Sequence, residues 1–386
     1  MINQTEQTLY RLGNLDAQQT RISYQMSTGK KLENGSDDSV LYAREIYVDD
    51  KIRMYEGLKT QIERTTAQNN VSDSSVGEIK SLLEFVKTEL IKANTSTTTD
   101  EGLKAIAVSI AGVRENLFDL SNTQVEGEYL FSGSDSSVQT FSKNSDGTIS
   151  YNGDNSLRKV IVDEGSYRQR GINGYDMMMY SSSTASKGET LSFTSEEQIF
   201  DENGNEWKIG SGGGGLRKYD LDGNLLAYSL VDPVTVIPGL SNNGAIPPIY
   251  SIVLPNTDGT NFEAKTSIFN VLDDVINALN KVDSLGNPIS DAEAKAGISK
   301  GQTDISNAYD GVNVAHAELG GRNKIFEISL ERIDSKLTQY NILSQELGAA
   351  DLSKVAMEAK ALELTYTALY STISKTNQLS LVNFLN

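Results

Sequence analysis

The sequence predicts an α+β fold in which helices from both termini form an elongated antiparallel coiled-coil bundle around an inserted, mostly β middle domain. Three observations predict it: a heptad pattern of apolar residues in the last third of the chain, similar helical spacings in the first third, and short strand-like runs between them. The heptad seam near the C-terminus comprises Ile305, Val312, Leu319, Phe326, Ile333, Tyr340 and Leu347.

The first third of the chain is expected to be helical throughout. A first helix ends within residues 27–35, and Asp37 and Asp38 are residue types that cap a second helix, which runs from about residue 39 toward residue 92. A polar turn at residues 94–100 leads into a third helix that continues to about residue 122. The first helix carries an apolar stripe of Leu12, Leu15, Ile22 and Met26, and the third carries Leu103, Ile106, Ile110, Val113 and Leu117.

A seam of six heptads needs a partner helix to cover its apolar side chains. The third helix, residues 103–120, has the same spacing, and we expect it to be that partner. The two ends of the chain would then pack against each other.

After residue 126 the pattern changes to that of an inserted β-domain, residues 128–264. Asp146-Gly147 and Asn152-Gly153 are expected to form hairpin turns, because a type I′ turn needs positive φ at both central residues. The run Met177-Met178-Met179 fits either an adaptable interface or a strand edge. A helix returns at residues 267–281 and leads back to the long C-terminal helix.

The long C-terminal helix loses its register at residues 348–351, where a second seam begins. We expect this seam to pair with the stripe of the first helix through Leu362, Tyr366, Leu369 and Ile373. The chain finishes on apolar residues that need cover from another helix or another subunit, among them Leu379, Val382 and Leu385.

Composition excludes several classes of function. The 386 residues carry a formal charge of −18, which argues against nucleic acid as a partner, because phosphate binding depends on clustered Lys and Arg. The chain has no Cys and one His, so disulfides, thiolate metal sites and Cys nucleophiles are excluded. Neither a signal-peptide pattern nor an apolar run of about 20 residues is present, and we expect no membrane span.

Isolated motifs that suggest chemistry have simpler structural interpretations. Residues 220–224 and 201–205 resemble parts of a calcium loop, but the first lacks the Gly and Glu of a complete one, and hairpin turns are favoured for both. Residues 210–215 lack the Lys-Ser or Lys-Thr of a phosphate-binding loop. His316 and Asn323 occupy seam positions and are interpreted as polar residues that fix helix register. The sequence therefore predicts no catalytic, cofactor or metal site.

Two motifs at opposite ends resemble the flagellin family: residues 26–42 (MSTGKKLENGSDDSVLY) and residues 319–334 (LGGRNKIFEISLERID). Residues 122–133 (NTQVEGEYLFSG) and 151–154 (YNGD) are similar to members found at the hook–filament junction rather than to the filament subunit. The resemblance covers about residues 1–175 and 265–386. The chain departs from the filament pattern at residues 39–42 (SVLY) and at residues 348–351 (GAAD), and both departures favour a junction protein.

The resemblance implies a structural protein, not an enzyme, that is exported by the flagellar type III apparatus and assembles outside the cell at the hook–filament junction. It implies three domains: residues 1–38 with 350–386 as terminal helices of an inner core layer, residues 39–127 with 265–349 as a coiled-coil domain, and residues 128–264 as an outer β-rich domain. The implied partners are other copies in a ring, hook-associated protein 1, flagellin and an export chaperone. Two alternatives stay open: a filament subunit, and a secreted enzyme or glycan-binding module in the middle domain.

Overall fold

The computed structural model describes residues 2–95, 98–145, 147–186, 188–194, 197–202, 205–210, 214–219, 225–226, 236–243, 248–254 and 261–385. For residues 2–5, 8 and 376–385 the description covers the backbone alone. The predicted turns at residues 146 and 220–224, and parts of those at 201–205 and 210–215, lie outside the described residues.

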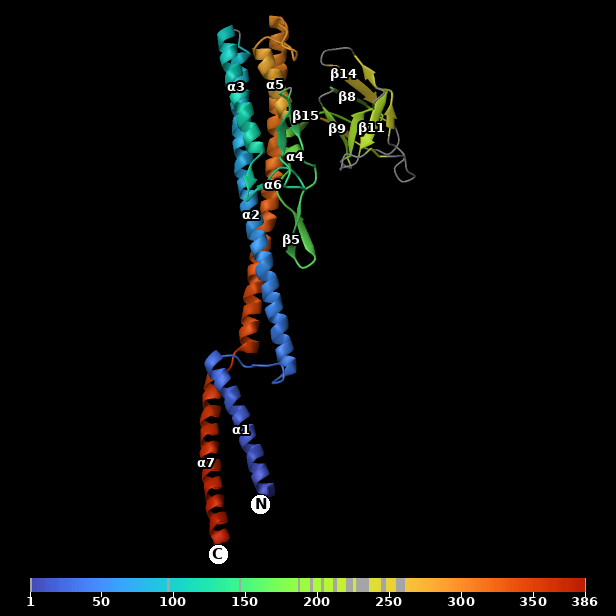
Figure 1. Ribbon diagram of the computed structural model, residues 1–386. Helices are drawn as coiled ribbons and strands as arrows, with labels where there is room; N and C mark the ends of the chain where they lie inside the picture. Colours follow the sequence, from blue (N-terminus) through green and yellow to red (C-terminus); the bar gives the residue numbers. More distant parts are fainter. Residues whose placement is uncertain are drawn as a thin grey trace. The chain divides into compact units, whose positions relative to one another are not determined.

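The α+β fold class is confirmed, with helices from both ends of the chain and a middle region of antiparallel sheets (Figure 1). The helices are α1 (Ile2–Thr28), α2 (Ser39–Ala93), α3 (Asp100–Ser121), α4 (Gly174–Met178), α5 (Ile268–Leu279), α6 (Asp291–Gly348) and α7 (Leu352–Leu385). The strands are β1 (Gln124–Val125), β2 (Glu128–Tyr129), β3 (Phe141–Lys143), β4 (Ile149–Tyr151), β5 (Lys159–Asp163), β6 (Ser166–Gln169), β7 (Met179–Ala185), β8 (Thr190–Thr194), β9 (Gln198–Asp201), β10 (Glu206–Ile209), β11 (Gly215–Tyr219), β12 (Val236–Pro238), β13 (Ser241–Asn242), β14 (Ile249–Val253) and β15 (Phe262–Ser267).

Contacts divide the chain into two compact units. Unit 1 comprises Met1–Thr60 and Leu330–Asn386, and unit 2 comprises Gln61–Ser329. The boundary falls within α2 and α6, so each of these helices contributes to both units.

Local capping explains why the helices begin where they do. The Asp38 carboxylate accepts hydrogen bonds from the N–H groups of Val40 and Leu41 at the start of α2, which confirms the predicted cap. Asp37 instead accepts from the N–H groups of Glu33 and Asn34 and orders the preceding turn. The aspartate pair therefore has a structural role at this helix start.

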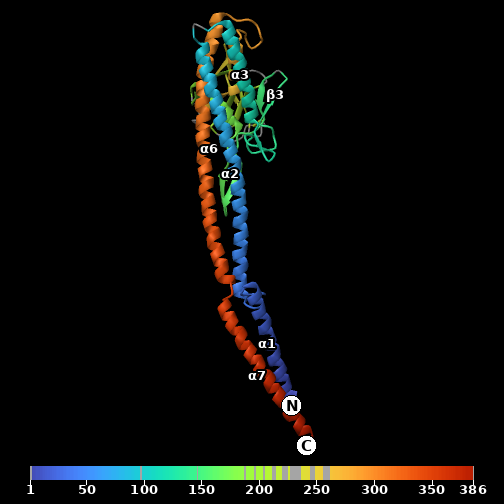
Figure 2. The same ribbon diagram turned by 90° about the vertical axis from the view of Figure 1, so that its left-hand side faces the viewer.

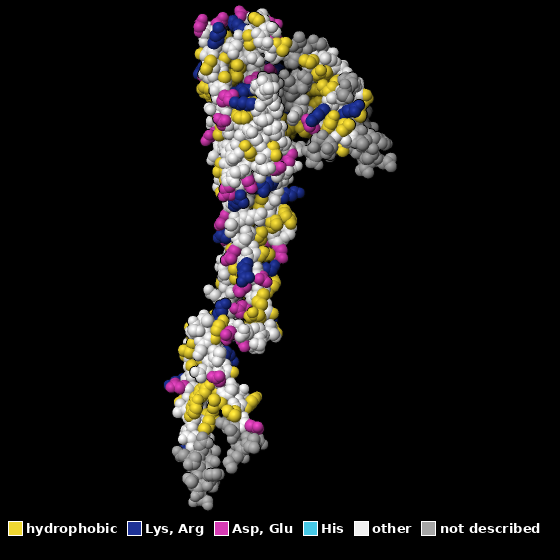
Figure 3. Space-filling view, in the orientation of Figure 1, with side chains coloured by type: hydrophobic (Ala, Val, Ile, Leu, Met, Phe, Trp, Pro, Cys, Tyr) yellow, Lys and Arg dark blue, Asp and Glu magenta, His cyan; other side chains and the backbone are white. Residues whose placement is uncertain are grey.

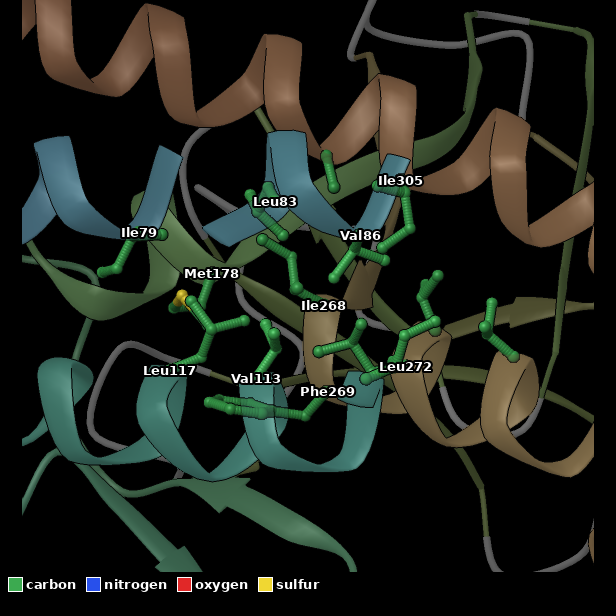
Figure 4. Packing of buried hydrophobic residues seen from close by; sticks show 14 of the residues in the cluster. Ile79, Leu83, Val86, Val113, Leu117, Met178, Ile268, Phe269, Leu272 and Ile305 are labelled. Atoms are coloured by element: carbon green, nitrogen blue, oxygen red, sulfur yellow. The ribbon is translucent and has the colours of Figure 1, made fainter. Parts of the chain in front are cut away.

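The core of unit 2 is built where α2, α3, α5 and α6 converge. Figure 4 shows Leu83 and Val86 of α2 pointing toward Leu117 of α3, Phe269 of α5 and Ile305 of α6. All five side chains are buried at 0% exposure. Burial of this size is the main stabilising contribution to the unit.

The prediction that the third helix, now α3, covers the C-terminal seam was wrong. In unit 2, α6 lies beside α2 (Figure 1 and Figure 2), where Asn94, directly after α2, donates to Gln302 on α6 at 3.4 Å, and α3 packs mainly against α5. A helix rises about 1.5 Å per residue, so the 22 residues of α3 cannot cover the 58 of α6, whereas the 55 of α2 nearly match it. Spacing alone did not distinguish the two candidates.

Small residues let α5 lie close to α6. A Cβ added at Gly301 would be 2.2 Å from Cγ2 of Val275, and one added at Gly297 would be 2.8 Å from Cβ of Ala278. Val275 is fully buried on α5, so a methyl group at Gly301 would force a shift within the core. The absence of a side chain at these two positions of α6 therefore allows the close contact with α5.

The middle region forms a second core between two antiparallel sheets. Within the described residues, one sheet has the order β12-β11-β10-β9-β15-β7 and the other has the order β13-β14-β8. Trp207 and Phe262 from the larger sheet pack with Phe193 and Ile252 from the smaller one. Trp207 also donates its indole N–H to the buried Asp201 carboxylate at 3.0 Å, so its polar atom is satisfied.

One expectation for the middle region was wrong, and the structure bears on the two interpretations of the methionine run. Asn152-Gly153 is no hairpin turn: it follows β4, and a Cβ at Gly153 would lie 2.3 Å from the Ser132 carbonyl oxygen, so glycine is needed there for close packing. Met177 and Met178 lie in α4 and Met179 begins β7, and all three are buried. The methionine run thus belongs to the core rather than to an exposed interface.

Candidate assembly surfaces

The first candidate surface is the pair formed by α1 and α7 in unit 1. Ile22 of α1 and Val355 and Leu362 of α7 are buried against one another, with exposures of 6%, 5% and 8%. Arg21 Nη2 lies 3.6 Å from Glu358 Oε2 at the edge of this cluster, where both side chains are half exposed. A cluster this small gives the two helices limited support.

The structure brings together part of the predicted interface. Leu15 and Tyr366 pack on this cluster, whereas Leu12, Leu369 and Ile373 are half-buried on the same two helices. Met26 is 54% exposed and lies outside the contact, because Gln25 takes the buried position at the end of α1. The side chains of Leu379, Val382 and Leu385 lie outside the described residues.

Other apolar side chains of α1 and α7 face outward. Figure 3 shows hydrophobic side chains at the surface of this helix pair. Their exposed fractions are well above half for Leu9, Tyr10, Met357, Leu364 and Tyr370. Several exposed apolar side chains on one helix pair are typical of a site that another protein covers.

The second candidate surface is the seam between α2 and α6. Its α6 residues Ile305, Val312, Leu319, Phe326 and Ile333 are at most 1% exposed, and Tyr340 and Leu347 are half-buried. In unit 1, the ring of Tyr340 stacks on that of Tyr55 of α2 with centroids 5.6 Å apart. Leu103, Ile106, Ile110, Val113 and Leu117 of α3 are also buried, in the core of unit 2 rather than against α6 alone.

Polar residues mark the register of this seam. His316 Nε2 lies 3.0 Å from Asp73 Oδ1, and its Nδ1 lies 3.4 Å from Lys80 Nζ, so the imidazole contacts two α2 side chains that are one heptad apart. Asn323 has a buried side-chain oxygen with no hydrogen-bond partner among the described residues. Both residues lie at the helix–helix contact, as the sequence indicated.

A third group of residues was missed by sequence reasoning. The carboxylate of Glu128 on β2 accepts hydrogen bonds from Gln68 of α2 at 3.2 Å, from Arg158 at 3.0 Å and from Arg170 at 3.2 Å. Arg64 of α2 adds an ion pair at 3.7 Å. We call Glu128 with these four partners the Glu128 cluster; it joins α2 to the segment that follows α3.

The Glu128 cluster shifts the pKa of its central carboxyl. Burial alone raises the pKa of Glu128, but the hydrogen bond from Gln68 and the charges of Arg158 and Arg170 outweigh it, and the net pKa is lowered. A signal was present in the sequence: the apolar heptad of α2 between Ile62 and Val76 is interrupted by polar residues. Those interior positions are Thr65, Asn69 and Ser72, each at most 3% exposed.

A polar cleft of about 1050 Å³ lies in unit 2 between α3, α5 and β4. Its charged lining is internally paired: Arg114 Nε is 2.7 Å from Asp273 Oδ1, and Arg114 Nη2 is 2.8 Å from Asp273 Oδ2.

Among the described residues no group of three or more His, Asp or Glu side chains is arranged to hold a metal ion. In the same part of the chain, every helix is too short or too polar to cross a bilayer.

Residues 2–136 match the family model of the bacterial flagellin N-terminal helical region. Flagellar hook-associated protein 3 from Salmonella typhimurium is 26% identical over 131 residues, which cover 33% of this chain and 41% of that protein. The same-named protein from Escherichia coli is 26% identical over 141 residues, 36% of this chain and 44% of the relative. The aligned segment thus spans less than half the length of either relative.

Solved structures agree at the level of the fold. The structure of flagellar hook-associated protein 3 from Legionella pneumophila superposes with a TM-score of 0.52 at 19% identity, covering 78% of this chain and 98% of that one. A putative flagellar hook-associated protein from Vibrio parahaemolyticus gives 0.53 at 13% identity, with coverage of 81% and 100%. The chain therefore resembles the flagellin family through its N-terminal helical region and, within that family, flagellar hook-associated protein 3.

Proposed function

We propose that this protein is a structural component of the bacterial flagellum that docks on the end of the hook and provides the surface on which the flagellin filament begins. The observation that carries this proposal is the match of the N-terminal helical region to flagellin and to hook-associated protein 3. The α1–α7 pair adds a physical reason, because its exposed apolar side chains need neighbouring subunits to cover them.

The interface residues proposed are those of the terminal stripes. On α1 and α7 the apolar residues would pack between neighbouring copies in a ring, with hook-associated protein 1 on one side and flagellin on the other. In this proposed arrangement the near-neutral terminal helices, residues 1–38 and 350–386, would lie inward, the coiled-coil domain around them, and the acidic β-rich domain, residues 128–264, outward. Residues 128–297 carry a net charge of −11, which suits a solvated outer surface.

Export and location follow from the same proposal. The chain would leave the cell through the flagellar type III apparatus with the help of a cytoplasmic chaperone, and would act outside the cell without catalysing a reaction. Exposed terminal helices with little mutual contact would be largely unfolded before assembly, because isolated helices are marginal in water. Docking would then couple folding to assembly.

The test is deletion of the gene in its own bacterium, with flagella viewed by negative-stain electron microscopy and the medium assayed for flagellin. The proposal predicts hooks without filaments and flagellin monomers in the medium. Loss of flagellin from the medium would instead favour the filament-subunit alternative. Normal filaments would contradict both the junction role and the filament-subunit role and would favour a secreted module. A glycan-binding screen of the whole chain would then test that alternative.

A further inference from the structure

The two interruptions between helices in unit 1 are joined to each other. Lys31 N donates to the Gly348 carbonyl at 2.7 Å, and Ala350 N donates to the Gly29 carbonyl at 2.8 Å. Between them, Lys30 and Ala349 form an antiparallel bridge. We call residues 29–31 and 348–350 the clasp.

Side chains and backbone geometry support the clasp. Gln25, 9% exposed, donates from Nε2 to the Lys31 carbonyl at 2.7 Å. Gly29 has a φ of +69°, a conformation that favours glycine. At Gly348 an added Cβ would lie 3.1 Å from Glu45 Oε1, so the Glu45 carboxylate would have to shift slightly. The interruption of the helices is thus specified by several residues.

The clasp also ends one helix and begins another. Gly29 N donates to the Gln25 carbonyl and closes the last turn of α1. Asp351, directly after the clasp, caps α7 by accepting from the N–H groups of Ser353 and Lys354 at 3.0 and 3.1 Å. Both helices therefore have a capped end at the same place.

Burial decreases away from the clasp. On the inward-facing stripes, Ile22 and Val355 lie within a few turns of it and are 6% and 5% exposed, whereas Leu12 and Ile373, farther along α1 and α7, are only half-buried. Starting a helix is costly, since several residues must be fixed before the first hydrogen bond forms, but extending one is not. A site that fixes two helix ends together lowers that cost for both.

We propose that the clasp is a nucleation device for the terminal helix pair: it starts α1 and α7 in register, and helix formation spreads from it toward residues 2 and 385. This inference rests on the proposed function, because it describes how terminal helices that fold on docking would begin in the correct alignment. Docking subunits would then extend two helices that already begin in register.

Hydrogen exchange of the purified full-length monomer, read by mass spectrometry, tests the device. The expected result is protection of the Lys31 and Ala350 amides, with protection falling along α1 toward residue 2 and along α7 toward residue 385. Uniformly fast exchange along both helices, the clasp included, would overturn the proposal.

Two proline variants give a matched comparison. Ala350→Pro removes the N–H that bonds to Gly29, and the extended conformation of Ala349 tolerates a following proline. Leu352→Pro, the control, places proline at the first position of α7, where proline is accepted. Ala350→Pro is expected to speed exchange at Lys31 and over residues 15–28 about fivefold, as for loss of one backbone hydrogen bond, while Leu352→Pro leaves it unchanged.

A second variant tests the clasp without introducing proline, which could itself strain the backbone. Gln25→Ala removes only the side-chain bond to Lys31 and should speed exchange at Lys31 in the same direction, whereas Gln19→Ala, at an exposed position of α1, should not. Equal exchange in each variant and its control would contradict the device. Because the monomer is measured, this outcome is separate from the deletion test: a protection gradient together with normal filaments would reject the junction function but keep the clasp.

Discussion

Glu128 on β2 and Arg170 after β6 lie 3.2 Å apart, from Oε2 to Nη2, and the same carboxylate oxygen also accepts from Arg158 at 3.0 Å. The Arg170 side chain is 12% exposed and that of Glu128 26%. One carboxylate therefore balances two arginines, of which Arg170 is largely removed from water and Arg158, 37% exposed, is not.

Replacing the central carboxylate should destabilise unit 2. Glu128→Gln leaves the two arginines without a counter-charge, at an expected cost of about 1–3 kcal/mol in the free energy of unfolding. Urea unfolding followed by circular dichroism measures it. The control is Glu126→Gln, which removes a 59% exposed partner of Arg64 and should cost less than about 1 kcal/mol. Equal effects of the two variants would show that the Glu128 cluster has no special importance.

The contribution of Glu128 to the free energy of unfolding should depend on pH. The pKa of Glu128 is lower in the folded chain than its ordinary value of 4.5, so its stabilising contribution is complete above that pH and is lost as pH falls through the folded pKa. The difference in unfolding free energy between the natural chain and Glu128→Gln should therefore shrink between pH 6 and pH 3. A difference that stayed constant over this range would mean that the folded pKa is not lowered.

Replacing two glycines of α6 by alanine should change the stability of unit 2 in opposite directions. Gly301→Ala brings a methyl group against the buried Val275 and should destabilise unit 2 by about 1–3 kcal/mol. Gly320→Ala, in the same helix with open space around it, should stabilise it by up to about 1 kcal/mol, because alanine favours helix. Thermal unfolding of both variants measures this. Stabilisation by Gly301→Ala would contradict the close α5–α6 contact.

The α1–α7 cluster should matter for assembly but not for unit 2. Leu362→Asp places a charge in the small apolar cluster with Ile22 and Val355 and should prevent incorporation into flagella, because a buried unpaired charge is costly. Leu362→Met keeps an apolar side chain of similar volume and should assemble normally. Complementation of the deletion strain measures filament number per cell. An unchanged melting temperature of unit 2 would show that Leu362→Asp has not unfolded the whole chain.

The helical part of the fold was largely predictable because its signals are local. The cap at Asp38, the end of α1 before Gly29 and the break between α6 and α7 all lie within a few residues of their cause. The apolar positions of α6 were predictable for the same reason: a heptad shows which face is buried without showing what covers it.

Other features depend on contacts between distant segments. The strand order β9-β15-β7 joins residues about 60 to 90 positions apart, and no periodicity in the sequence specifies it. Thr65, Asn69 and Ser72 are buried although they are polar, and the sequence alone does not show which segment covers them. Met26 was assigned to the α1–α7 contact on hydrophobicity, yet Gln25 is buried there because its amide bonds to the clasp.

The central claim is that this protein occupies the junction between hook and filament. Immunogold electron microscopy of intact flagella, with antibody against this chain, tests it most directly. The account predicts label confined to a narrow band between hook and filament, which disappears in the deletion strain. Label along the whole filament would identify a filament subunit, and label absent from the flagellum would contradict a flagellar role altogether.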